Sequence, residues 1–391
     1  MSDTLIRARQ AAVAVKIETT KGTDVIAGSP VAADFVASDC QVTFDQATVP
    51  DPQYTGSLDG APPIVGGMRP RFTLRMALRG SGTPGTAPEF GKLLRCCTMV
   101  ETTTSATVGA PTAASAGTVS TLTAGAPFGT TAQQYRGMPL LLTGTVPDSI
   151  SKTIITDYTA AKVATVLHTA GTAFSTGALM QIPINVLYGP TSDETAYKTA
   201  TVYLYMDGLL WTFLGCTGSW GIEVTTGGIA YLTFTMTGQF GAKSTATFPT
   251  AAVGSIRQTP PRFVGGIMRL NGALARVRSF SLDAGVGTVL PDNPEANEGY
   301  DPAIPIDRAM SGALDPLMDT TTSVGLFTNF RTGVNMRLGA IIGSTAGNRF
   351  AVCVPAARAT RNNPTTRDGL GANAIAYQAD GADAGAFIAQ F

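Results

Sequence analysis

The stretch Thr201-Val-Tyr-Leu-Tyr-Met-Asp-Gly-Leu-Leu-Trp-Thr-Phe-Leu-Gly-Cys216 decides the class of fold. Two strand-like runs, 201–206 and 209–216, flank the dipeptide Asp207-Gly208. Asp-Gly supplies the positive φ angles that a two-residue type I′ turn requires. The stretch therefore predicts an antiparallel β-hairpin, and much of the remaining chain carries the same kind of signal.

Alternating segments on either side of this hairpin predict further strands. A second hairpin is expected from 220–225 and 229–240, which are joined by Thr226-Gly227-Gly228. In 69–79, apolar and polar residues alternate with a period of two, which indicates a strand with one buried and one wet face. The buried face has Phe72, Leu74, Met76 and Leu78, and the wet face has Arg71, Thr73, Arg75 and Arg79. Pro88, early in 86–98, predicts one short helix that packs on the sheet.

The composition is also typical of a mainly β protein. Of 391 residues, 44 are Gly and 24 are Pro, which suits many turns. Only 14% are charged, with 27 Lys and Arg against 27 Asp and Glu. This balance argues against a free-standing nucleic-acid or membrane-surface binder, and it leaves little repulsion between copies, which favours self-association.

The N-terminus and the cysteines indicate the compartment. No apolar run is long and unbroken enough for a signal peptide or a membrane span. The five cysteines form no Cys-x-x-Cys pair. We therefore expect synthesis in a reducing cytoplasm, with the thiols used as small apolar fillers.

The order of predicted elements occurs twice. The first half has a strand at 41–45, a Gly/Pro-rich excursion at 50–70, the Phe72 strand, the helix near residue 90, a hairpin and a final strand. The second half repeats this order with a strand at 276–283, an excursion at 286–305, a strand at 307–314, a helical segment at 322–331, a hairpin at 334–342 and 349–357, and a strand at 372–379. The repeated order predicts a tandem duplication of one β domain.

Residues 102–190 interrupt the first copy. They carry few charges but several aliphatic runs, so they predict a small inserted β domain and not a disordered linker. The predicted organisation is a first β domain from 1–101 and 191–258, the insertion at 102–190, and a second β domain at 259–391.

Four motifs together resemble the major tail tube protein of long-tailed, non-contractile (siphovirus-type) bacteriophages. They are Lys16-Ile-Glu-Thr-Thr-Lys-Gly-Thr-Asp24, Leu78-Arg-Gly-Ser-Gly-Thr-Pro-Gly-Thr-Ala-Pro-Glu-Phe-Gly91, Asp207-Gly208 with the Trp211 strand, and Phe280-Ser-Leu-Asp283 with Gly347-Asn-Arg349. The resemblance covers both halves and departs mainly in the 102–190 insertion.

The resemblance implies two tandem β-sandwich or half-barrel tube domains, each with one short helix. Such domains stack as rings into a hollow virion tail that is assembled in the bacterial host cytoplasm and has other tail proteins at its ends. DNA passes through the channel without specific binding, so we expect a neutral to acidic lumen. The resemblance implies no catalytic residue, cofactor or metal.

Ring closure follows from strand edges, because an unpaired edge is a template for another chain. Two tube domains per chain would let three copies close a ring with pseudo-six-fold symmetry, whereas one tube domain per chain would need six. We favour the trimer, with the hexamer as the alternative.

A search for chemistry finds no catalytic constellation. His168 is the only histidine and lies in a strand-like run, so a plain core or surface role is favoured. Residues 238–244 resemble a phosphate loop but lack its spacing, and 369–374 contain part of a dinucleotide motif but precede a predicted strand.

Charged residues supply the candidate contacts between subunits. Asp292, Glu295, Glu298 and Asp301 place four carboxylates in one loop, whose spacing is not that of an EF-hand. We expect them to meet the Arg71, Arg75 and Arg79 stripe of the next ring; a plain solvated face is the alternative. The alternative functions are a phage capsid-decorating or adhesin protein and, less favoured, a hydrolase with paired carboxylates.

Overall fold

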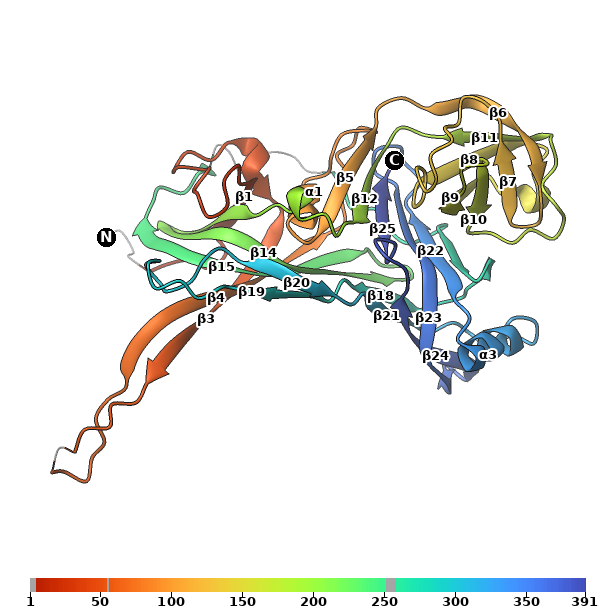
Figure 1. The fold of residues 1–391 in the computed structure, drawn as a ribbon. Coiled ribbons are helices and arrows are strands. Elements are labelled where there is room, and N and C mark those ends of the chain that lie inside the picture. Colours follow the sequence, from red (N-terminus) through yellow and green to blue (C-terminus); the bar gives the residue numbers. More distant parts are fainter. Residues whose placement is uncertain (1–4, 55, 251–257) are drawn as a thin grey trace.

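The computed structural model describes residues 5–54, 56–250 and 258–391, which form a mainly β molecule with two α-helices. A large antiparallel sheet of 17 strands runs through it, and a closed six-stranded barrel lies at one end (Figure 1). A long hairpin projects from the opposite end (Figure 1). The predicted mainly β class is confirmed.

The first part of the large sheet, segment A, has the strand order β3–β4–β15–β14–β13–β1, and every neighbouring pair is antiparallel. Its core face is lined by Phe72, Leu74 and Met76, which share a core with Leu93 and Leu94 of the helix α1 (Gly91–Arg95). The strands are β1 (Ala11–Ile17), β3 (Ser38–Val49), β4 (Ile64–Ala77), β13 (Ala200–Met206), β14 (Leu209–Thr225) and β15 (Tyr231–Thr245).

The second part, segment B, has the order β18–β21–β24–β23–β22–β16, again with every pair antiparallel. The helix α3 (Ser323–Thr332) packs against β23. The strands are β16 (Ile267–Leu270), β18 (Ser279–Asp283), β21 (Ser311–Leu314), β22 (Met336–Ile342), β23 (Phe350–Arg367) and β24 (Leu370–Ala379).

Seven further strands complete the sheets. Within the large sheet, β2 pairs with β1, β17 with β16, β25 with β23 and β12, and β12 with β5. A separate two-stranded sheet contains β19 and β20. These strands are β2 (Phe35–Val36), β5 (Met99–Thr104), β12 (Asn185–Pro190), β17 (Ala273–Leu274), β19 (Val286–Val289), β20 (Ile304–Arg308) and β25 (Phe387–Gln390), and 3-10 turns lie at Ala32–Asp34, Pro147–Ser149 and Glu194–Ala196.

The barrel closes in the order β10–β7–β6–β11–β8–β9, with β8 and β10 each pairing with β9. Its core is continuous with Ile341, Cys353 and Phe387 of the large sheet. Its strands are β6 (Val108–Gly117), β7 (Thr121–Ala124), β8 (Pro139–Gly144), β9 (Lys152–Tyr158), β10 (Val163–Val166) and β11 (Ala178–Ile182). The flanking strands β5 and β12 belong to the large sheet, where Thr104 lies opposite Asn185.

Several local predictions are confirmed. Asp207 and Gly208 have φ angles of 39° and 93° and join β13 to β14. The alternating strand at 69–79 is part of β4, whose Phe72, Leu74 and Met76 are buried. The helical segment predicted at 322–331 is α3, and the hairpin predicted at 334–357 is β22–β23.

Other predictions of element boundaries are wrong. The helix expected over 86–98 is only α1, because Pro88 lies in a preceding turn and Thr98, at φ 58°, turns the chain away. The strand expected at 307–314 is divided between β20 and β21, which lie in different sheets. Runs 209–216 and 220–225 are one strand, β14, whose register shifts absorb the residues between them. The excursion expected at 50–70 ends earlier than predicted, since β4 begins at Ile64.

Candidate assembly interface

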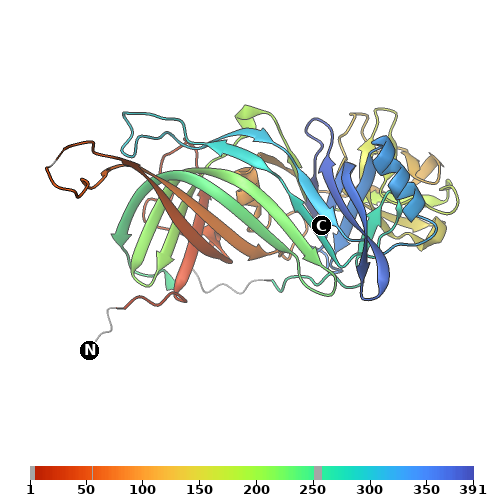
Figure 2. The same ribbon diagram turned by 90° about the horizontal axis from the view of Figure 1, so that it is seen from below.

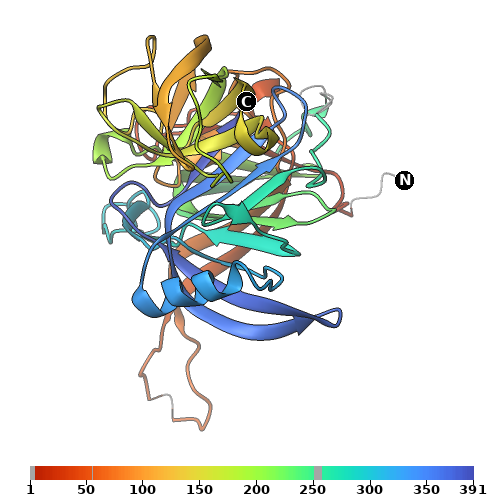
Figure 3. The ribbon, with the colours of Figure 1, turned by 90° about the vertical axis from the view of Figure 1, so that its right-hand side faces the viewer.

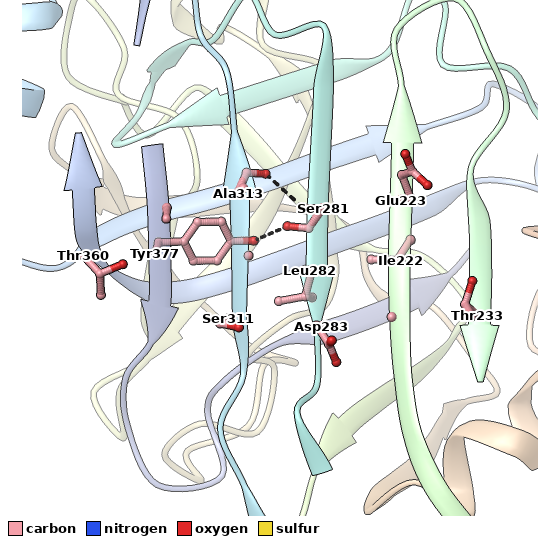
Figure 4. Close-up of a pocket in the computed structure, with 13 residues that line it drawn as sticks. Ile222, Glu223, Thr233, Ser281, Leu282, Asp283, Ser311, Ala313, Thr360 and Tyr377 are labelled. Carbon is pink, nitrogen blue, oxygen red and sulfur yellow. Dashed lines mark hydrogen bonds between the residues drawn. The ribbon is translucent and has the colours of Figure 1, made fainter. Parts of the chain in front are cut away.

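Segments A and B join through backbone pairing. Gly221–Thr225 of β14 lie antiparallel to Ser279–Asp283 of β18, which makes the sheet continuous (Figure 4). Figure 4 shows polar side chains of Glu223, Thr233, Ser281 and Asp283 on neighbouring strands at this junction. The hydroxyl of Tyr377 in β24 donates to the Ser281 carbonyl at 3.0 Å and ties three strands together.

A second contact between the two halves links the motifs that carried the resemblance. The Gly80 amide donates to Asn348 Oδ1 at 2.8 Å, and the Gly82 amide donates to the Gly347 carbonyl at 3.2 Å. Gln390 Nε2 donates to Ser81 Oγ at 2.7 Å and to the Gly347 carbonyl at 2.8 Å. Residues 78–91 and 347–349 therefore hold the two halves together.

The N-terminal motif is organised by a buried carboxylate. Glu18 is 6% exposed, and its Oε2 accepts from the Gly22 amide at 2.8 Å and the Thr199 hydroxyl at 2.6 Å. Its Oε1 accepts from the Thr201 hydroxyl at 3.0 Å and the Gly215 amide at 2.8 Å. Four donors thus satisfy both carboxyl oxygens, and Glu18 holds Gly22 and Gly215 in place.

The whole connection between β18 and β21, residues 284–310, contains the excursion predicted at 286–305 and keeps the name excursion below. It folds back over Gly22 and Gly215, which with Glu18 form the platform for it. Pro302 packs against Gly22 and Gly215, where a Cβ would come within 2.7 and 2.5 Å of its ring. Gln239 Nε2 donates to the Tyr300 carbonyl at 2.6 Å, and the Ala303 amide donates to the Gly215 carbonyl at 3.2 Å. The excursion is therefore seated on β14 and β15 of the same chain.

The hairpin formed by β3 and β4, residues 44–70, behaves differently and is called the arm. It extends away from the molecule in Figures 1 and 2. Tyr54 and Leu58 near its end are fully exposed, and Val49, Ile64 and Val65 along it are also exposed. The arm thus presents apolar side chains that no described part of the chain covers.

The seven predicted contact residues lie on two elements that meet within one chain. Arg71 and Arg75 are exposed on β4, and the Arg75 guanidinium lies 4.0 Å from the Tyr231 ring centroid. Arg79 is half-buried just after β4. No described ion pair joins these three arginines to the predicted carboxylates.

The acidic loop contacts the base of the arm within the same chain. Asp292 Oδ1 lies 3.7 Å from the guanidinium of Arg69, and Glu298 Oε2 accepts from the Met68 amide at 3.0 Å. Asp301 Oδ1 accepts from Asn293 Nδ2 at 2.7 Å, while Glu295 is exposed. Arg69 belongs to the same alternating face as Arg71, a signal from which it could have been included.

The other chemical candidates are part of the packing. His168 is 3% exposed and its Nδ1 lies 2.9 Å from Thr153 Oγ1; burial, with the nearby Arg269, lowers its pKa to about 4. Cys96, Cys97, Cys216 and Cys353 are buried free thiols whose pKa values burial raises. Residues 238–244 lie in β15, and 369–374 lie at the β23–β24 turn and in β24.

Residues 5–54, 56–250 and 258–391 contain no cluster of His, Cys, Asp or Glu side chains suited to a metal ion. No helix among them is long and apolar enough to cross a membrane. What the fold offers is a sheet with unpaired strand edges and an exposed apolar arm.

A family model described as phage tail tube protein matches residues 8–382, nearly the whole chain. The chain belongs to the phage tail tube protein family. It is a structural, non-enzymatic component of the phage tail, and tail tube proteins self-polymerise. Comparison with curated proteins finds no match.

Proposed function

We propose that this tail tube protein stacks as rings into the hollow tube of a long non-contractile tail, through which DNA passes during ejection. The observation that carries the proposal is the exposed apolar arm beside an unpaired edge of β3. Both features are costly on a solitary monomer and become buried in a polymer.

Negative-stain electron microscopy of concentrated, purified protein tests this proposal. Hollow tubes of constant width are expected. Persistently dispersed particles would overturn it. In virions that carry the protein, a tail without a contractile sheath is expected, and a sheathed tail would contradict the non-contractile assignment.

We further propose that the chain contains two tandem tube domains, 1–101 with 191–258, and 259–391. The identical strand order of segments A and B supports this, since six strands recur in the same sequence with the same antiparallel pairing. Each segment also has one helix between corresponding strands, α1 after β4 and α3 after β21.

A duplicated chain favours a ring of three copies with pseudo-six-fold symmetry. Native mass measurement of isolated rings tests this directly. Three chains per ring are expected, and six chains would overturn the trimer.

The 102–190 segment is proposed to decorate the outside of the tube. Thr104 and Asn185 lie opposite one another on β5 and β12, so a short turn can replace 105–184. Tubes are expected to form without the barrel, with some loss of stability because Phe387 and Ile341 lose their cover. Folded protein that no longer forms tubes would contradict an outer, dispensable barrel.

Arg71, Arg75, Arg79, Asp292, Glu295, Glu298 and Asp301 remain proposed inter-subunit contacts. Arg71 and Glu295 have the strongest support, because they are exposed and have no described ion pair. Asp292 and Glu298 are already engaged by the base of the arm.

A further inference from the structure

Two strand stretches at opposite ends of the large sheet each have one free edge. Among the described residues, β3 pairs only with β4. The pairing of β22 with β23 ends at Ala357, so Asn363–Arg367 of β23 pair only with β24. The β23–β24 hairpin that bears this second edge, drawn in blue, protrudes at the lower right in Figure 3. An unpaired edge is a template for a further strand.

The junction between segments A and B within one chain shows how a free strand edge of this kind can pair with another segment. There β18, the outermost strand of segment B, pairs with the end of β14. By position in the strand order, β3 corresponds to β18, and β23 corresponds to β14. The junction of β14 with β18 is therefore a template for a junction of β23 with β3.

The register of this second junction can be read across each segment. Cys40, Leu74, Phe234 and Trp220 lie in one row of segment A. Phe280, Leu314, Ile375 and Asn362 form the matching row of segment B. With these rows aligned, the arm and the excursion are both 27 residues long, at 44–70 and 284–310. Since Phe280 lies opposite Val224, Cys40 would lie opposite Thr366, and Gln41 opposite Thr365.

We propose that β3 of one chain pairs antiparallel with Asn363–Arg367 of β23 in a second copy, and that its arm lies across that copy. The excursion 284–310 makes the equivalent contact with segment A inside each chain. The proposal rests on tube formation and identifies which strands close the ring. The contact is head-to-tail, so it closes only around a ring.

The apolar arm explains why this contact needs a second copy. The excursion buries Tyr300 and Ala303 against its own chain, whereas the arm exposes Tyr54 and Leu58. Figures 1 and 2 show the arm and the excursion reaching toward the same side of the molecule, the arm beyond segment A. The arm thus points to where segment B of a neighbouring copy would lie.

Pro364 reduces the number of backbone hydrogen bonds that the free edge of β23 can make with a new strand. The Asn373 amide opposite it donates to the Pro316 carbonyl, away from β23, so the backbone of Pro364 faces the free edge. Proline has no N–H, and the new ladder lacks one donor there. Strand pairing alone is therefore weak, and the arm contributes the remaining burial.

Cysteine cross-linking tests the predicted register. Gln41 and Thr365 are exposed and would form a non-hydrogen-bonded pair, in which Cα atoms are about 4.5 Å apart, close enough for a disulfide. The variant Gln41→Cys/Thr365→Cys is made with Cys40→Ala, and tubes are oxidised. We expect covalent dimers and trimers and nothing larger. The matched control is Gln41→Cys/Thr235→Cys, because Thr235 is exposed on β15, inside segment A.

Amide hydrogen exchange of the wild-type protein provides a second test of the same strand pairing, without any substitution. The amides of Cys40, Val42 and Thr366, which face the free edges, should exchange at least about tenfold more slowly in tubes than in monomers, because these edges become paired. Tubes that form with unchanged exchange at these amides, or with no cross-linking above the control, would overturn this pairing and leave the proposed function intact. Wild-type protein that forms no tubes would overturn the function itself.

Discussion

The arm and the excursion are two connections of equal length, but the excursion packs on its own chain and the arm projects away from it. Each joins an antiparallel strand pair at the same place in its segment, β3 to β4 and β18 to β21. The excursion is held by Pro302 on Gly22 and Gly215 and by the bond from Gln239 to Tyr300. The arm projects with exposed Tyr54 and Leu58. The difference teaches that one connection has its partner surface in its own chain and the other lacks it.

Removing the arm should have the largest effect. Gln46 lies opposite Met68, so Asn-Gly can replace 47–67 as a hairpin turn. Tubes should be lost entirely, while the free energy of unfolding of the monomer changes by only about 0.5 kcal/mol, since exposed residues are removed. Electron microscopy and chemical denaturation measure the two effects.

The matched excision is the equivalent shortening of the excursion. It should destabilise the monomer, because Tyr300 and Ala303 are buried. Equal effects of the two excisions on monomer stability would break the comparison.

Disrupting the platform under the excursion should have the next largest effect. Glu18→Ala leaves four donors without their acceptor, three of them buried, which should cost about 3–5 kcal/mol of folding stability. Limited proteolysis should then cut within 291–299 faster than in the wild type. Cutting confined to the arm would show that Glu18 does not support the excursion.

His168 belongs to the core of the barrel, which is separate from both the arm and the excursion, so it provides a control for stability changes at those two connections. The folded-state pKa of His168 is about 4, below the usual value of 6.5, so burial of the neutral ring stabilises the fold fully above pH 6.5. This contribution is lost as pH falls from 6.5 toward 4, by about 2 kcal/mol at pH 5. Denaturation of the wild type and His168→Gln at pH 7 and 5 should show a smaller pH effect in the variant. Identical pH dependence would exclude His168 as its source.

Charge reversal on the exposed face of β4, within segment A, should have the smallest effect on stability. Arg75→Glu loses the contact with Tyr231, worth about 0.5–1 kcal/mol at an exposed site, and leaves a soluble monomer. Tubes should be shorter or absent, whereas Arg75→Lys should retain most of the tube length. Tube lengths from micrographs check this, and normal tubes from Arg75→Glu would remove Arg75 from the interface.

Much of the fold could be predicted because local signals were strong. Asp207-Gly208 determined a turn, and the alternation at 69–79 determined which face of β4 is buried. The repeated element order also anticipated two sheet segments with the same strand order. These features depend on residues close together in the chain.

The errors arose where distant residues decide. The split at 309–310 depends on Ala309 donating to the Gly285 carbonyl, more than twenty residues away. The position of α1 also depends on a distant strand, because Gly91 at its start lies directly against the Tyr188 hydroxyl of β12. The contacts of the acidic loop also depend on distant residues, since Asp292 and Glu298 reach Arg69 and Met68 of the same chain. No local pattern encodes such contacts.

The sequence by itself determined the strands, their buried faces and the tail tube family, because turn geometry, side-chain alternation and short motifs are local. Only the tertiary structure decided which edges are paired, how segment A joins segment B, and why one 27-residue connection is seated while its counterpart projects. Pairing of this kind joins residues hundreds of positions apart, and backbone N–H and C=O groups are the same in every residue, so its partners emerge only when the sheet is assembled.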